Sequence, residues 1–327
     1  MQNLMKSLFL GAFVASIVTF TAQADPARWA MEGWKTDFSI TSINLARVLS
    51  GGPPRDGIPS IDDPQFKPHA EIDFLVDTEP VIGLVVNGEA KAYPLRILTW
   101  HEIANDQIGG VPVAVTYCPL CNSSIVFERT VNGNTVEFGT TGKLKDSNLI
   151  MYDRGGDNWW QQFTGEAIAG VATGTKLRLI PSRLQSFAEF KAENENGMVL
   201  VPSNPNMRDY GRNPYVGYDL AGAPFLYDGQ LPDYINPMER VVIVRRDEAD
   251  PIIVTMNKIS DAGKLSIDGY DLTWTAGQNS ALDQSDIRKG RDVGTVLVQK
   301  DGNDIFYDVT FAFVAHAFHP DIKIEQK

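Results

Sequence analysis

The two cysteines of the chain stand three positions apart, in the stretch VTYCPLC that ends at Cys121. Cys118 and Cys121 therefore form a Cys-x-x-Cys motif, and the chain has no other cysteine. Such a pair suits three kinds of chemistry: binding of a metal ion by thiolates, thiol–disulfide exchange and a structural disulfide in an exported protein. A disulfide across so short a loop adds little stability, because it removes little loop-closure entropy.

The segments on either side of the motif are both typical of β-strands. VPVAVTY precedes the proline-containing turn and SSIVFERTV follows it, and both are rich in β-branched and aromatic residues. In thioredoxin-like proteins, by contrast, the motif opens a helix. We therefore expect Cys118 to Cys121 to form a knuckle-like turn between two strands. Two thiolates leave a tetrahedral metal site incomplete, so a metal ion would need further ligands.

Histidines are the candidates for those further ligands. His101 lies in HEIAND, which also contains Glu102 and Asp106, and metal-bound imidazole commonly donates its second N–H to a carboxylate. His316 and His319 share one face if their segment is helical. We rank His101 above His319, and both above His316. The metal-binding hypothesis is a copper or zinc site formed by Cys118, Cys121, His101 and His319, with Glu102 and Asp106 in support.

Other functional motifs are missing from the sequence. It contains no Gly-x-Ser-x-Gly elbow, no phosphate-binding loop and no His-Glu-x-x-His helix. We therefore expect no nucleotide cofactor. The formal net charge of −12, with no basic cluster, argues against a nucleic-acid partner. The alternatives to metal binding are a thiol–disulfide redox protein and a non-catalytic binding module with a structural disulfide.

The N-terminus has the pattern of a secretory signal peptide. Lys6 precedes an apolar run from Leu8 to Phe20, and small residues follow at Ala22 and Ala24. The run is shorter than the roughly 20 residues of a membrane-spanning helix, and no later stretch is apolar enough to cross a bilayer. We expect cleavage after Ala24 and a periplasmic or secreted protein without a membrane span.

The remaining patterns predict a mainly β protein with a few short helices, an α+β fold made of two related β-rich halves. Asn87-Gly88 and Asn132-Gly133 are favoured dipeptides of two-residue hairpin turns. Ser186 and Glu189 form a capping box that predicts a helix, and WHEIANDQIGG suggests one helical turn and a loop. The expected regions are a signal peptide 1–24, an extended arm 25–78, a first half 79–201, a proline-rich connection 202–238 and a second half 239–327.

A weak internal repeat relates the two halves. EPVIGLVVNGEAKAYPL is echoed by ERVVIVRRDEADPIIVT, VTYCPLCNSSIVF by LTWTAGQNSALDQ, and SFAEFKAE by TFAFVAHAF. A duplicated fold would bury the same apolar positions twice, and only one copy would need its thiols. The alignment pairs Cys118 with Thr275, Cys121 with Gln278 and Phe187 with Phe311.

Several motifs between residues 51 and 322 resemble the bacterial and archaeal domain-of-unknown-function family 3179. They include RDGIPSIDDPQF, AKAYPLRILTWHEIANDQIGGVPVAVTYCPLCNSSIVF, WWQQFTGEAIAG and AFHPD. The resemblance implies that His101, Cys118 and Cys121 occupy the family's motif positions, and it implies no activity. Many relatives have Gly where this chain has Asn122. Since Asn tolerates left-handed backbone conformations well, we expect the turn to be kept.

Overall fold

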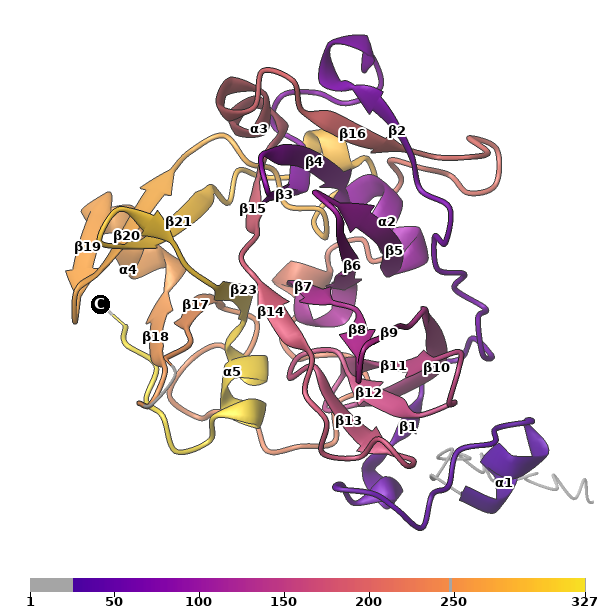
Figure 1. Ribbon diagram of the computed structural model, residues 1–327. Coiled ribbons are helices and arrows are strands. Elements are labelled where there is room, and N and C mark those ends of the chain that lie inside the picture. The colour runs from indigo at the N-terminus through magenta and orange to yellow at the C-terminus, as the bar shows by residue number, and fades with distance from the viewer. Residues whose placement is uncertain (1–25, 247–248, 327) are drawn as a thin grey trace, which may run out of the picture.

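The computed structural model describes residues 26–246 and 249–326. The predicted signal peptide, 1–24, lies outside the described residues. Strands greatly outnumber helices along the described chain, and the helices are short (Figure 1), which confirms the mainly β prediction. Within the described ranges, no helix combines the length and the apolar character needed to cross a bilayer.

The first half begins with a strand–strand–helix–strand–strand unit that leads into the cysteine turn. Its elements are β3 (Pro80–Val86), β4 (Glu89–Pro94), α2 (Leu95–His101), β5 (Ile103–Ile108), β6 (Val111–Cys118), η3 (Pro119–Cys121) and β7 (Ser123–Glu128). Asn87 and Gly88 form the predicted turn between β3 and β4, both with positive φ (50° and 82°). This conformation is that of a type I′ turn, whose twist matches the strands it joins.

Two sheets complete this half. One has the order β15-β3-β4-β16-β2, and the other has the order β14-β7-β6-β5. The added elements are β2 (Gln65–Pro68), η2 (His69–Glu71), β14 (Arg178–Ile180), β15 (Arg183–Ser186), α3 (Phe187–Glu193) and β16 (Met198–Val201). The predicted capping box is present at the start of α3, where the Ser186 and Glu189 side chains each bond the other's backbone N–H.

A third sheet has the order β1-β10-β11-β12-β13, and all of its strands except β1 are inserted in the chain between β7 and β14. It lies at the bottom of Figure 1, beside the N-terminal arm. Its strands are β1 (Leu49–Ser50), β10 (Phe138–Lys145), β11 (Asn148–Asp153), β12 (Trp159–Gln161) and β13 (Glu166–Ala169), preceded by the short hairpin β8 (Thr130–Val131) and β9 (Asn134–Thr135). The arm, with α1 (Pro26–Met31) and η1 (Leu45–Arg47), packs Trp29 and Trp34 against Trp159.

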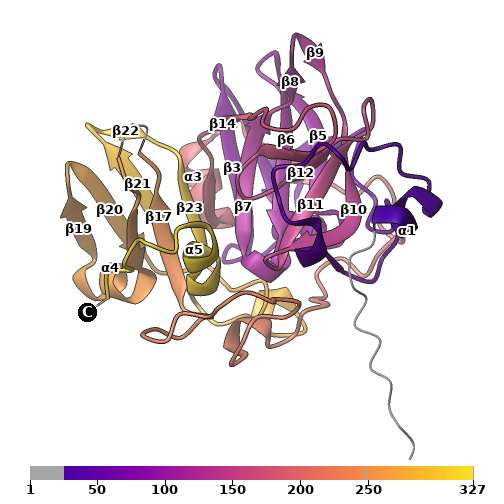
Figure 2. The ribbon, with the colours of Figure 1, turned by 90° about the horizontal axis from the view of Figure 1, so that it is seen from below.

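The second half lies beside the first (Figure 2) and repeats the order of most of its strands. Its elements are β17 (Arg240–Val244), β18 (Ile252–Thr255), α4 (Met256–Ala262), β19 (Lys264–Ile267), β20 (Tyr270–Thr275), η5 (Ile287–Lys289), β21 (Thr295–Lys300), β22 (Asn303–Asp304), β23 (Tyr307–Phe311) and α5 (Ala312–Phe318). The order β18-β17-β23 corresponds to β4-β3-β15, and β19-β20-β21-β22 corresponds to β5-β6-β7-β14. Buried side chains of both halves, such as Ile82 and Val242, belong to one continuous core.

The strand register supports one predicted correspondence between the halves and corrects another. Thr275 ends β20 opposite Thr295, as Cys118 ends β6 opposite Ser123. Phe311 pairs with the first residue of β17, the place that Ser186 takes against β3, so Phe311 corresponds to Ser186 and not to Phe187. The pairing of Gln278 with Cys121 stays a prediction, because the connection from β20 to β21 is much longer than the cysteine turn and offers no register for comparison.

The segment predicted as one helical turn and a loop is also corrected. α2 ends at His101, and the residues after it form strand β5, which pairs with β6 along its whole length. Asn105 and Asp106 belong to residue types that are uncommon in strands, so the sequence pattern did not indicate β-structure here. The proline-rich connection contains only the single turn η4 (Tyr218–Leu220) as regular structure.

Candidate functional site

The cysteine motif forms the tight connection between β6 and β7. Cys118 ends β6, a single 3₁₀ turn follows, and Asn122 turns the chain back in a left-handed conformation (φ 49°). The predicted turn between two strands is confirmed, and no α-helix begins at Cys121. Asn122 adopts the conformation for which Gly is best suited, as expected. Both sulfurs belong to free thiols, and both residues are buried.

One backbone carbonyl accepts hydrogen bonds from both thiols. The oxygen of Ser147 lies 3.8 Å from Sγ of Cys118 and 3.5 Å from Sγ of Cys121. Ser147 is the second residue of the two-residue turn between β10 and β11, so the inserted sheet supplies this contact. The side-chain amide of Asn148 also donates to Sγ of Cys121, at 3.5 Å. The sulfurs are therefore held by a fixed polar frame inside an apolar cluster.

The surroundings shift the pKa values of the two thiols in opposite directions. Burial acts to raise the pKa of the Cys118 thiol, but hydrogen bonds from the Cys121 thiol and from backbone N–H groups of the turn and of Leu149 stabilise its thiolate, and the pKa is lowered. The pKa of the Cys121 thiol is raised well above its ordinary value by burial and by the charge of Cys118. Cys118 is thus the more acidic thiol of the pair.

Glu102 is the acidic neighbour of this pair. It caps the C-terminus of α2 in a left-handed conformation (φ 60°), and its side chain is buried. The pKa of its carboxyl is raised well above the usual range by burial and by the charge of Cys118. The protonated form of this carboxyl is therefore favoured, and its charge is coupled to that of the nearby sulfur.

Backbone strain is concentrated around the same site. Among the described residues other than Gly, Asn and Asp, positive φ occurs at three positions: Glu102, Ser147 and Leu226. Ser147 accepts hydrogen bonds from the thiols, and the other two line the adjacent cavity. Each such conformation costs about 1–3 kcal/mol and persists only where the surrounding structure enforces it. Strained residues of this kind often cluster at functional sites.

A narrow, mainly apolar cavity of about 100 Å³ lies next to the turn. Its walls include the side chains of Glu102, Leu120, Leu149, Tyr215 and Leu226. Residues of the proline-rich connection thus form one wall of the site.

The same connection is tied to the cysteine turn by hydrogen bonds. The Tyr218 hydroxyl donates to the Leu120 carbonyl at 3.0 Å, and the Ser147 hydroxyl donates to the Phe225 carbonyl at 2.6 Å. Composition had indicated only a connecting segment here, and no pattern in it pointed to the cysteines.

His101 is held in place by hydrogen bonds at both ring nitrogens. Nδ1 lies 2.7 Å from the carbonyl oxygen of Pro59 and must donate, so in the neutral ring Nε2 accepts from the Tyr210 hydroxyl, also at 2.7 Å. Burial lowers the pKa of this imidazole, which favours the neutral form. Asp106 does not orient His101, because its carboxylate accepts from Lys91 and Tyr93 instead.

The structure places His319 directly after α5, whose helical nature and end were predicted. Nε2 of His319 is buried without a hydrogen-bond partner, and burial followed by the charge of Arg245 lowers the pKa of the ring. Across the described part of the chain, no group of three or more His, Cys, Asp or Glu residues is arranged to hold a metal ion. Glu102, named only as a support for His101, instead neighbours Cys118.

Comparison with known proteins finds one family. No curated protein and no solved structure matches the sequence. The family described as "Protein of unknown function (DUF3179)" matches residues 55–322, which is most of the chain and close to the span expected from the motifs. The cysteine turn, Glu102 and His101 all lie within the matched region. The chain therefore belongs to the DUF3179 family.

Proposed function

We propose that Cys118 and Cys121 form a reversible dithiol–disulfide couple, and that the protein transfers two electrons between this couple and small thiol compounds. The arrangement that carries this proposal is a pair of free thiols directed at one carbonyl, that of Ser147, with unequal surroundings. Thiol–disulfide exchange needs only two neighbouring sulfurs, one of them a thiolate. It requires no third ligand.

The proposed reaction with a small disulfide is balanced as follows. The Cys118 thiolate attacks one substrate sulfur, the substrate S–S bond breaks, and the departing thiolate takes the proton of Glu102. The Cys121 sulfur then attacks Cys118, forming the intramolecular disulfide, and its proton goes to the second departing thiolate. One thiolate, one thiol, the protonated Glu102 carboxyl and one substrate disulfide become one protein disulfide, two substrate thiols and the Glu102 carboxylate. Glu102 ionises in this scheme because the neighbouring negative charge has disappeared.

Burial restricts the substrate to small molecules. Cys118 is 2 % exposed and Cys121 is 0 % exposed, so a folded protein substrate has no direct route to either sulfur. The cavity beside Glu102 admits only the end of a small molecule. Predicted export would place the couple in an oxidising compartment, where the disulfide form is maintained and a small thiol is the natural reductant.

A redox titration tests the proposal. The mature protein is equilibrated in glutathione buffers of graded potential, quenched in acid, denatured and labelled with a maleimide, and the labels are counted by mass spectrometry. We expect both thiols to disappear together in a two-electron transition, with a tenfold change in the equilibrium constant for each 30 mV or so. Cys118→Ser and Cys121→Ser should abolish the transition.

Two outcomes would contradict the couple. Thiols that stay reduced under oxidising buffers would exclude it, and a disulfide that resists strong reductants would indicate a structural bridge. The relative alkylation rates of the two thiols give a further check. In Cys121→Ser the remaining thiol should be alkylated faster at neutral pH than in Cys118→Ser, because Cys118 is the more acidic sulfur.

Copper or zinc binding stays a prediction, and the cysteine turn is its candidate centre among the described residues. The hydrogen bonds at both nitrogens of His101 favour redox chemistry over a shared His–Cys site. Metal analysis of protein purified under reducing conditions separates the two functions. Stoichiometric copper or zinc that is lost in Cys118→Ser would favour metal binding.

A further inference from the structure

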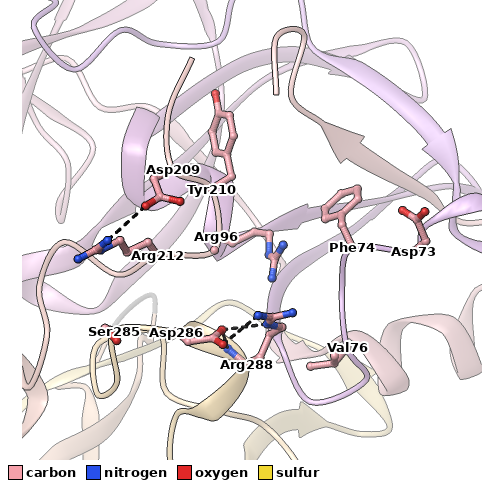
Figure 3. Close-up of a pocket in the computed structure, with 11 residues that line it drawn as sticks. Asp73, Phe74, Val76, Arg96, Asp209, Tyr210, Arg212, Ser285, Asp286 and Arg288 are labelled. Carbon is pink, nitrogen blue, oxygen red and sulfur yellow. Dashed lines mark hydrogen bonds and ion pairs between the residues drawn. The ribbon is translucent and has the colours of Figure 1, made fainter. Parts of the chain in front are cut away.

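A second, larger cavity is lined in part by α2, and it shares no lining residue with the cavity beside the cysteine turn. It has a volume of about 560 Å³ and is lined by residues from both halves and from the proline-rich connection (Figure 3). Arg96 comes from α2, Tyr210 and Arg212 come from the connection, and Arg288 comes from η5 of the second half. Nothing in the redox proposal uses this cavity.

The guanidinium groups of Arg96 and Arg288 point toward one another across this space (Figure 3). Arg96 donates from Nε and Nη2 to the two carboxylate oxygens of Glu79, both at 2.8 Å. Arg288 donates in the same way to Asp286, both at 2.9 Å. Each arginine therefore turns one edge to its own carboxylate and leaves Nη1 on the other edge.

Neither Nη1 has a hydrogen-bond partner among the described residues. Arg96 is only 7 % exposed as a whole. Its Nη1, which has no hydrogen-bond partner within the described ranges, is nevertheless not fully buried. The little surface that Arg96 exposes thus includes donors that open into the cavity. Gly211 lets the guanidinium lie close to the backbone, because a Cβ there would be 3.1 Å from its central carbon.

Two facing guanidinium groups with free N–H donors are a natural receptor for an oxyanion, whose oxygens match the planar donor fork. We propose that this cavity binds a small molecule through a carboxylate or phosphate group held between Arg96 and Arg288. Asp73 and Asp209 also line the cavity. They favour a ligand that carries a single oxyanion together with hydroxyl or ammonium donors, and they disfavour polyanions.

The net charge of the chain argues against non-specific binding of anions. A protein with a formal net charge of −12 repels anions at long range. Non-specific anion binding is therefore not expected, and any affinity must come from local hydrogen bonds.

Arg288→Gln is the informative variant, because Arg96 cannot be changed without leaving the buried Glu79 carboxylate unpaired. Lys289→Gln is the matched control: it removes one positive charge from the neighbouring residue of η5, which does not line the cavity. Calorimetric titrations would use inorganic phosphate, acetate and serine, with sodium chloride at equal ionic strength as the reference. Phosphate and the two carboxylates distinguish the two classes of oxyanion.

We expect at least one oxyanion to bind the unchanged protein and Lys289→Gln with equal affinity, and to bind Arg288→Gln at least tenfold more weakly. Arg288→Lys should recover only part of the loss, since an ammonium group lacks the planar fork. Absence of binding by every probe would overturn the proposal. Equal binding to Arg288→Gln, or full recovery by Arg288→Lys, would also overturn recognition by the two guanidinium groups.

Discussion

Replacing Glu102 by glutamine should remove part of the pH dependence of the protein's stability. The pKa of this carboxyl is raised in the folded chain, first by burial and then by the charge of Cys118. Above its ordinary pKa the unfolded chain therefore releases this proton while the folded chain retains it. Ionisation then favours the unfolded state, so the folded protein loses stability as the pH rises through this window. Glutamine carries no such proton.

The size of the effect follows from proton linkage. One proton retained on folding gives a slope of about 1.4 kcal/mol per pH unit. The window opens near the ordinary value of 4.5 and extends upward, because the folded pKa lies well above that value. For each pH unit of this window, the glutamine variant should gain up to about 1.4 kcal/mol in unfolding free energy relative to the unchanged protein.

Urea denaturation between pH 4.5 and 7.5, with reductant present, measures this difference. Any constant cost of burying the amide cancels, because only the change with pH is compared. Glu195→Gln, at an exposed position, corrects for the general effect of removing one carboxylate. A difference between Glu102→Gln and the unchanged protein that stays flat across the range would refute the raised pKa, and with it the role of Glu102 as a proton carrier.

Substitutions at two further positions test the cysteine turn and a buried ion pair. Asn122→Ala should lower the unfolding free energy by about 1 kcal/mol, because alanine is strained at φ 49°, whereas Asn122→Gly should not lower it; equal losses in both would mean that the left-handed turn is unimportant. Asp219→Ala should cost about 3–5 kcal/mol in the same assay, because it leaves the buried Arg240 without its carboxylate partner. Removing the exposed partner in the Lys191–Asp77 pair by Asp77→Ala should cost less than about 1 kcal/mol, and similar losses at the two positions would contradict the dependence on burial.

Local signals in the sequence predicted local structure well. Asn87-Gly88 marks a hairpin because this turn needs two residues that tolerate positive φ, and Ser186 marks a helix start because its side chain can bond a free backbone N–H. The cysteine turn was predicted for a similar reason, since strand-forming residues flank it on both sides. Each of these features depends on residues within about one turn or hairpin of each other.

The environment of the sulfurs could not be predicted in this way. Ser147 and Asn148 reach the cysteines from a different sheet, and neither residue type signals such a contact. His101 was favoured because acids adjoin it in the sequence, yet adjacent residues at the helix–strand junction diverge. Its ring contacts Pro59 and Tyr210, while Glu102 next to it neighbours Cys118.

The comparison of the two halves indicates why only the first contains thiols. Thr275 takes the place of Cys118 at the end of the equivalent strand, but Thr275 is exposed and Cys118 is buried. In the second half β21 and β22 are joined by the two-residue turn 301–302, whereas in the first half all strands of the third sheet except β1 are inserted between the equivalent strands β7 and β14.

That insertion buries the cysteine turn. It also supplies the Ser147 carbonyl, which lies within hydrogen-bonding distance of both sulfurs. Thiols at the equivalent end of β20 would face solvent without this acceptor. The inserted sheet, more than the duplicated fold, therefore creates the site. A cysteine introduced by Thr275→Cys should accordingly be an exposed thiol of ordinary reactivity, which alkylation kinetics on a Cys118→Ser, Cys121→Ser background would show directly.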